Sequence, residues 1–189
     1  SLSPVEVTGL SGLVAINAGG NHTLALVDDG TLWAWGYNEY GQVGDGTEED
    51  QYSPALVTDL SGVMAVTAGS NHSLALLDDG TLRAWGQDSS GQLGDGWSGT
   101  GAATPVAIDT LGDIGELAAG SYFSMALDSE GVLWAWGDNS SGQLANGTLG
   151  DNSTPTSIDS LGVVEVAGAG GDQAFAVDSD GTVWRWGDG

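Results

Sequence analysis

The sequence has no cysteine, no lysine and only two arginines, Arg83 and Arg185, among its 189 residues. Without cysteine it can form neither a disulfide framework nor a thiolate metal site. Two cationic side chains cannot make the basic surface that binds nucleic acid, and the same shortage excludes electrostatic binding to anionic membranes. The chain has no apolar run of about 18 residues and no basic segment leading into an apolar one, so it predicts no membrane-spanning helix and no signal peptide.

Acidic residues and glycine dominate the composition. The 26 acidic side chains give a formal net charge of −24, and 33 residues are glycine. Apolar residues still make up 40% of the chain and include eight tryptophans, so the chain can bury a real core. The acidity favours solubility in an extracellular or high-salt environment, and cation binding or a basic partner is the sharper alternative.

Internal repeats organise the whole chain. The segment at residues 18–26 recurs at 68–76, 119–127 and 169–177, with spacings of 50, 51 and 50 residues. Trp-Gly pairs and prolines follow the same spacing. The sequence therefore predicts one repeat domain over residues 1–189, with units at about 1–50, 51–100, 101–151 and 152–189.

Each unit has the pattern of a small antiparallel sheet. In the first unit, residues 23–26 and 31–35 alternate between two faces and flank an Asp-Asp-Gly turn, which predicts a hairpin. Residues 12–16 and 54–57 predict a third and a fourth strand, and Pro54 suits an outer edge that needs no donor. No apolar period of 3.6 residues runs long enough for a helix. We expect four strands in each unit.

Such a sheet is apolar on both faces and must pack against its neighbours. We expect a bulky face and a face of smaller residues, namely Leu24, Leu26, Trp33 and Trp35 on the first and Thr23, Ala25, Leu32 and Ala34 on the second. Bulky faces packed on small-residue faces are typical of radially stacked blades, so the sequence predicts an all-β propeller. An open β-solenoid is the alternative.

The repeated patterns resemble a known family. They are Ala-Gly-x-x-His-Ser/Thr-Leu-Ala-Leu, then Asp-Gly-x-Leu-x-Ala-Trp-Gly, then Gly-Gln-Leu-Gly or a variant of it at residues 41–44, 91–94 and 142–145. Four copies in phase make the chain similar to bacterial-type RCC1 (regulator of chromosome condensation) repeat proteins. The resemblance implies a propeller with four-stranded blades, usually seven of them. It also implies that the protein interacts with partners as a binding module.

Two activities of the eukaryotic type member do not transfer through this resemblance. Nucleotide exchange on a small GTPase requires a loop and a face that no residue of this chain matches. Contact with chromatin is opposed by the acidic charge.

The fourth unit stops after its Trp-Gly strand and lacks an outer strand of its own. Pro4, Val5 and Val7 match the outer-strand pattern and could pair with the strand that carries Trp184 and Trp186. Closure could form a four-blade ring in one chain. It could instead form an eight-blade dimer or a fibre by strand exchange. The chain could also be a piece excised from a longer repeat protein.

The candidate chemistry is sparse. His22 and His72 align with Phe123 and Gln173 in the other units, so we expect a structural role in which a ring nitrogen bonds to backbone. No nucleophile, base and orienting group come together, so we predict no catalytic residue, no metal ligand and no cofactor.

The acidic turns and the loop aromatics remain as candidates. A turn such as Asp28-Asp29-Gly30, or its copy at Asp78-Asp79-Gly80, offers too few oxygens for calcium and is explained by turn chemistry. The acidic loop is a better candidate for a weak cation or a basic partner, and the aromatics outside the repeat pattern are candidate anchors. The partner-binding candidates are Tyr37, Tyr40, Tyr52, Trp97, Glu48, Glu49 and Asp50.

We therefore predict a non-enzymatic protein-binding or scaffold module that binds neither nucleic acid nor membrane, and a homodimer is one of its open arrangements. The alternative is a structural subunit that self-assembles by exchange of the N-terminal strand. An enzyme or exchange factor ranks third.

Overall fold

The computed structural model describes residues 2–188, which form four antiparallel sheets in succession along the chain. Apart from strands, the described residues contain one short 3-10 helix, η1 (Asp159–Leu161). None of them forms a helix that could cross a membrane. The strands are β1 (Leu13–Ala18), β2 (His22–Val27), β3 (Leu32–Gly36), β4 (Gln51–Leu56), β5 (Val63–Ala68), β6 (His72–Leu77), β7 (Leu82–Asp88), β8 (Gly99–Ile108), β9 (Ile114–Ala119), β10 (Phe123–Asp128), β11 (Leu133–Gly137), β12 (Asn152–Ser157), β13 (Val164–Gly170), β14 (Gln173–Asp178) and β15 (Val183–Gly187).

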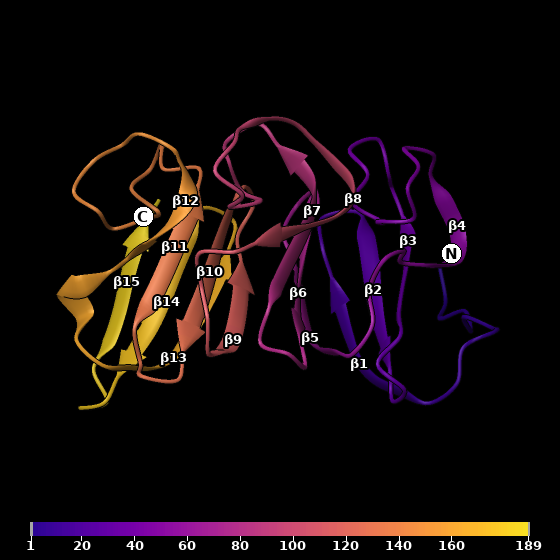
Figure 1. Cartoon of the computed structure of the whole chain (residues 1–189), viewed down its shortest axis with the longest axis horizontal. Helices are drawn as coiled ribbons and strands as arrows, with labels where there is room; N and C mark the ends of the chain where they lie inside the picture. The colour runs from indigo at the N-terminus through magenta and orange to yellow at the C-terminus, as the bar shows by residue number, and fades with distance from the viewer. Residues whose placement is uncertain (1, 189) are drawn as a thin grey trace.

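The four sheets stand side by side in a row, and we number them blades 1 to 4 in chain order (Figure 1). In blades 1 to 3 the strands are ordered β1-β2-β3-β4, β5-β6-β7-β8 and β9-β10-β11-β12, while blade 4 contains only β13-β14-β15. The first strands of neighbouring blades contact one another and form the inner side of the row. The missing outer strand of the fourth unit is thus confirmed, and the prolines at 54, 105 and 155 lie on outer strands, as their lack of a donor requires.

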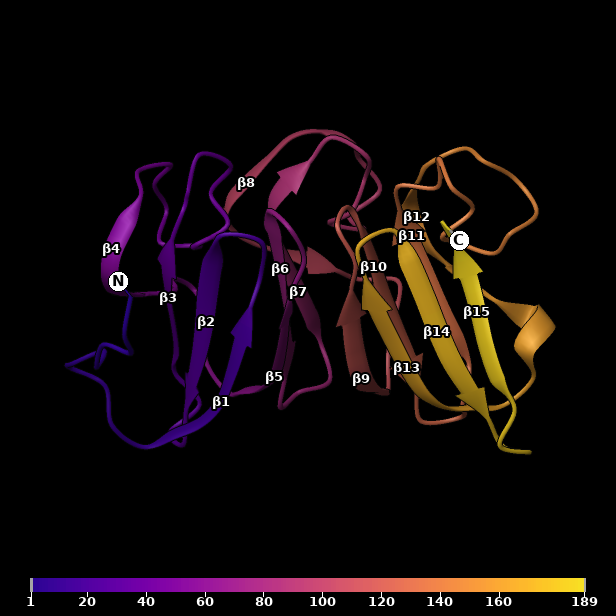
Figure 2. The same ribbon diagram turned by 180° about the vertical axis from the view of Figure 1, so that it is seen from behind.

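The expected closure strand is not a strand in this structure. Residues 2–12 form none, and Pro4, Val5 and Val7 are exposed. The N-terminus lies beside blade 1 and the C-terminus beside blade 4, at opposite ends of the row (Figures 1 and 2). The row of four blades curves too little for β15 to reach the N-terminal segment. One chain therefore does not close into a ring.

The assignment of side chains to faces was wrong. Residues directly opposite in paired strands point to the same face, and the register gives the pairs Leu24–Ala34, Leu26–Leu32, Ala25–Trp33 and Thr23–Trp35. The tryptophans therefore share a face with threonine and alanine, and the leucines share the other. Alternation in the sequence shows which residues of one strand share a face. Which residues of the neighbouring strand lie on that same face depends on the register, and the length of the turn sets the register.

The core lies in the seams between blades. The leucine face of blade 1 (Leu24, Leu26, Leu32 and Ala34) packs on the tryptophan face of blade 2 (Ala75, Leu77 and Trp85). The next seam repeats this arrangement with Leu74, Leu76 and Leu82 against Ala126 and Trp136. Because each blade buries its faces only against neighbours, its stability depends on the seam.

The Gly-Gln loops of blades 1, 2 and 3 lock the seams by crossing onto the next blade. The backbone carbonyl of Gln42 accepts hydrogen bonds from Trp85 Nε1 at 2.9 Å and Ser73 Oγ at 3.0 Å. A Cβ at Gly44 would lie 2.6 Å from Trp85 Nε1, so glycine lets the loop approach closely in this seam. Gln92 repeats this contact with Trp136 and Ser124 of blade 3, and Gln143 repeats the tryptophan part with Trp186 of blade 4.

The two histidines complete the first two seams. His22 Nε2 lies 2.9 Å from Ser73 Oγ, and His72 Nε2 lies 3.0 Å from Ser124 Oγ. Because each hydroxyl donates to a glutamine carbonyl, it accepts from the ring nitrogen. Burial lowers the pKa of His22 to about 4 and that of His72 to about 3, so both rings are neutral.

The expected histidine partner was therefore wrong, although the role is structural. The Nε2 atom of each ring bonds to a serine of the next blade and not to backbone, and Nδ1 of each ring has no hydrogen-bond partner among the described residues. In the third seam Phe123 replaces histidine and Ala174 replaces serine.

Candidate functional site

The connections between the third and fourth strands of blades 1, 2 and 3 lie along one edge of the row, at the top of Figure 1. They comprise residues 37–50, 89–98 and 138–151. We call these segments, with the first residue or two of the strands that follow, the loop edge. Loops on a rigid scaffold are the usual place for binding residues, and this edge carries every partner-binding residue predicted from the sequence.

Buried amides hold two of these loops in place. Asn38 Nδ2 donates to the carbonyls of Thr47 and Glu49, each at 3.0 Å. Asn139 Nδ2 donates to the carbonyls of Thr148 and Gly150, at 3.0 and 3.1 Å. Sequence reasoning missed these anchors, although a short polar residue two positions after each Trp-Gly pair was the available signal.

Two of the predicted aromatics pack against each other. The rings of Tyr37 and Tyr40 meet edge to face with centroids 6.2 Å apart. The Tyr37 hydroxyl donates to the Glu39 carboxylate, and this bond raises the pKa of Tyr37 to about 12. Both tyrosines thus have local partners within the loop of blade 1.

The other two aromatics project from the loop edge. The side chain of Tyr52 is 93% exposed and that of Trp97 is 77% exposed. Glu48 and Glu49 are exposed a few residues before Tyr52, while Asp50 also accepts a hydrogen bond from the backbone N–H of Asn38 at 2.9 Å. Sequence reasoning passed over a third exposed apolar residue of these loops, Leu149 in blade 3.

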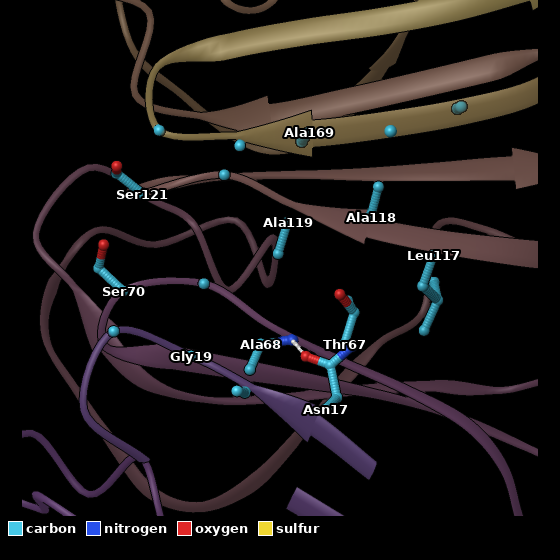
Figure 3. A pocket seen from close by; sticks show the side chains of 18 residues that line it. Asn17, Gly19, Thr67, Ala68, Ser70, Leu117, Ala118, Ala119, Ser121 and Ala169 are labelled. Carbon is cyan, nitrogen blue, oxygen red and sulfur yellow. Dashed lines mark hydrogen bonds between the residues drawn. The ribbon is translucent and has the colours of Figure 1, made fainter. Parts of the chain in front are cut away.

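A concave surface of about 450 Å³ lies along the inner strands β1, β5, β9 and β13 (Figure 3). Glycine, alanine and backbone line most of it, and Asn17 Oδ1 accepts a hydrogen bond there from the Ala68 N–H at 3.1 Å. Its lining contains no carboxylate, histidine or arginine. Within residues 2–188, no group of three or more histidine, aspartate or glutamate side chains could hold a metal ion.

The comparison with models of protein families shows to which family the chain belongs. Residues 29–76, 79–127 and 130–177 match the model of the regulator of chromosome condensation (RCC1) repeat. The chain belongs to the RCC1 repeat family. A second RCC1 repeat model matches residues 13–42, 64–92 and 116–143, and each of these matches begins in the first strand of a blade.

Curated relatives match single repeats of this RCC1 family member. The ultraviolet-B receptor UVR8 of Arabidopsis thaliana is 45% identical over 49 residues, which are 26% of this chain and 11% of UVR8. The RCC2 homolog of Danio rerio is 44% identical over 46 residues, which are 24% of this chain and 9% of that protein. The matched residues thus span about a tenth of either relative.

Solved structures match nearly the whole chain. Yeast RCC1 (Prp20) bound to Kap60 superposes with a TM-score of 0.87 at 25% identity, covering 98% of this chain and 46% of that one. Human WBSCR16 gives a TM-score of 0.84 at 27% identity, with 94% and 47% covered. Prp20p of Saccharomyces cerevisiae, described with its binding properties to Gsp1p and histones, gives 0.77 at 26% identity, with 86% and 43% covered. The RCC1-like blade architecture is therefore confirmed, and this chain spans just under half the length of these structures.

Proposed function

We propose that the RCC1-type blades form a non-enzymatic protein-binding module that recognises a basic segment of a partner along the loop edge. The observation that carries this proposal is the exposure of two aromatic side chains on the loop edge. Tyr52 lies just after the loop that the buried Asn38 amide holds in place, and Trp97 lies in the loop of blade 2. Exposed aromatics on a rigid surface provide binding energy at a small entropic cost.

The charge of the chain favours a basic partner. The net charge is −24, and Glu48, Glu49 and Asp95 are exposed on the loop edge. Complementary charge speeds encounter and sets specificity. The similarity to yeast RCC1, which was solved with Kap60 and described with Gsp1p and histones, supports a protein as the partner class.

An enzymatic role has little support in the geometry. The concave surface along the inner strands offers small side chains and backbone, and it lacks the paired titratable groups that acid–base or nucleophilic chemistry requires. The titratable groups of strongly altered pKa are instead placed in seams and loops.

The test is a binding titration with labelled lysine- and arginine-rich peptides, including core-histone tails, and with acidic peptides as a control. We expect basic peptides to bind selectively and to bind more weakly at higher salt. The double variant Tyr52→Ser/Trp97→Ser should reduce affinity by roughly tenfold or more. Met64→Ser, which removes an apolar side chain 64% exposed on β5, should leave affinity unchanged. Equal affinity of the double variant and Met64→Ser would contradict the proposal.

A second candidate function is self-assembly by strand exchange. It is favoured by the unpaired outer edge of β15 together with the exposed Pro4, Val5 and Val7, which match the outer-strand pattern. In this arrangement the N-terminal segment would pair with β15 of a second copy, alongside Trp184 and Trp186. Light scattering at 0.15 M salt should then give twice the 19.0 kDa chain mass, falling to the single mass when residues 1–8 are deleted. An unchanged mass after the deletion would rule this out.

A further inference from the structure

The loops of blades 1, 2 and 3 each start from a buried polar side chain at the same repeat position: Asn38, Asp88 and Asn139. In every case Oδ1 accepts the backbone N–H of the residue five positions on. The distances are 2.9 Å to Val43 N, 3.0 Å to Leu93 N and 3.0 Å to Leu144 N. The Oδ1 atom at this position therefore accepts the same backbone hydrogen bond in all three blades.

The second terminal atom differs between the blades. In blades 1 and 3 it is an amide nitrogen surrounded by oxygens. Asn139 Nδ2, for example, donates to the carbonyls of Thr148 and Gly150 and to Asn146 Oδ1 at 3.1 Å. In blade 2 the same atom is Asp88 Oδ2, an acceptor where the other blades have a donor.

Asp88 Oδ2 has no hydrogen-bond donor within the described part of the chain, residues 2–188, although the side chain is only 4% exposed. It borders a pocket of about 240 Å³ that Asp95, Trp97 and residues 98–102 also line. This burial, with a smaller effect of the nearby Asp95 carboxylate, raises the pKa of Asp88 to about 6. A carboxylate oxygen that has no donor and lines a pocket together with a second carboxylate is stabilised by a cation bound in that pocket.

We propose that this pocket binds a calcium ion. The carboxylates of Asp88 and Asp95 supply the charge, and backbone carbonyls of residues 97–101 and water complete the coordination. Calcium takes six to eight oxygen ligands in flexible geometry, and the pocket offers oxygen donors with room for water. Histidine and cysteine, which zinc prefers, are absent from its lining.

The expected affinity is weak. Only two carboxylates contribute, and the loop that bears Asp95 and Trp97 is exposed. Sites with few charged ligands bind calcium with a Kd of about 10⁻⁴ to 10⁻³ M. The pocket shares Asp95 and Trp97 with the loop edge. Calcium binding is measured without a peptide, so its test is independent of the test of the proposed function.

The test is calorimetric titration of the whole chain with CaCl₂ in 0.15 M KCl at pH 7.5, which is above the pKa of about 6 of Asp88. Wild-type protein should show one binding event, and Asp88→Asn or Asp95→Asn should weaken it by about tenfold or more. Both substitutions introduce residues that blade 3 already carries at these positions, so the fold should tolerate them.

The control is Asp109→Asn, which removes an exposed carboxylate at the end of β8 and changes the net charge equally. It should leave the affinity within a factor of two. If Asp88→Asn and Asp109→Asn behave alike, calcium binds only to the general negative surface and the proposal fails. The proposal also fails if the titration gives no heat and NMR shows that the Asp88 carboxyl takes up a proton near pH 6 both with and without calcium. In that case a proton on Asp88, and not a calcium ion, takes the place of the amide donor found in the other blades.

Discussion

The seams between blades 1 and 2 and between blades 2 and 3 are polar at their centres, whereas the seam between blades 3 and 4 is apolar at the same place. The first two pair His22 with Ser73 and His72 with Ser124, and the last has Phe123 with Ala174. Histidine occurs with serine and phenylalanine with alanine, with no mixed pair. A buried ring nitrogen needs a partner and a buried hydrocarbon ring does not, so the two positions change together.

The largest effect should come from the tryptophan that both kinds of seam share. Trp136 is fully buried and donates to the carbonyl of Gln92, so Trp136→Ala should lower the free energy of unfolding by about 3–5 kcal/mol. Trp186 donates to Gln143 in the same way and packs against the core of the third seam, but it is only partly buried, so Trp186→Ala should cost roughly half as much. Urea denaturation measures both, and equal losses would contradict the account of the seam.

The next largest change in stability is expected from substitutions that convert a polar seam into an apolar one. Ser124→Ala leaves His72 with no partner on either ring nitrogen and should cost about 1–3 kcal/mol. Adding His72→Phe recreates the pair found in the third seam and should recover most of the loss. A double-mutant cycle by urea denaturation therefore predicts a favourable coupling of about 1 kcal/mol or more, and additive single effects would refute the pairing.

The polar seams should also make stability depend on pH. In the fold the pKa of His22 is about 4 and that of His72 about 3, but both are near the ordinary value of 6.5 in the unfolded chain. Below pH 6.5 the two histidines take up protons in the unfolded chain but stay neutral in the folded one. The free energy of unfolding is therefore not reduced by them above that pH, and it falls as the pH falls below it. Between pH 6.5 and 5 each histidine should remove about 2 kcal/mol.

One carboxylate opposes this trend. The pKa of Asp88 is about 6 in the fold, so the folded state takes up its proton first and gains stability as the pH falls through 6. Denaturation at pH 7, 6 and 5 should therefore show a net fall that becomes steeper in Asp88→Asn. The fall should be only about one fifth as steep in His72→Phe/Ser124→Ala, because Asp88 then offsets most of the effect of the one remaining histidine. A flat profile in all three proteins would contradict the buried histidines.

The smallest effect concerns the loop over the tryptophan. Ala145 stands where the polar seams have Gly44 and Gly94, and it adopts a left-handed φ of 48°. Relief of this strain should make Ala145→Gly stabilising by up to about 1 kcal/mol. Gly94→Ala should be destabilising, because its Cβ would lie 2.6 Å from Trp136 Nε1. Thermal unfolding of both variants checks the opposite signs.

The repeats predicted the architecture because their signals are local. Alternation, Asp-Asp-Gly turns and edge prolines gave the blades and the missing strand of the fourth unit, and these strands are confirmed. The distribution of Trp33 and Trp35 between faces was wrong because it depends on register across the turn. The role of Pro4–Val7 was open because pairing with a distant strand depends on how far the row of blades turns.

The contacts across seams were harder to predict. The partner of His22 lies 51 residues away, and only the parallel change from His–Ser to Phe–Ala between units pointed to it. Asn38 and Asp88 were missed because short polar residues in loops usually suggest turns. Burial under the loop is a tertiary property, and it turns an ordinary Asn-to-Asp difference into a candidate ion site.

The most direct test of the seam is hydrogen exchange at the tryptophan indole N–H groups, followed by NMR in dilute solution. Trp85 and Trp136 donate to a carbonyl of the preceding blade and are fully buried, so their indole protons should exchange only on global unfolding. Trp35, the equivalent residue on the uncovered face of blade 1, should exchange orders of magnitude faster. Exchange of Trp85 and Trp136 as fast as that of Trp35 would contradict the claim that each blade is held by the loop of its neighbour.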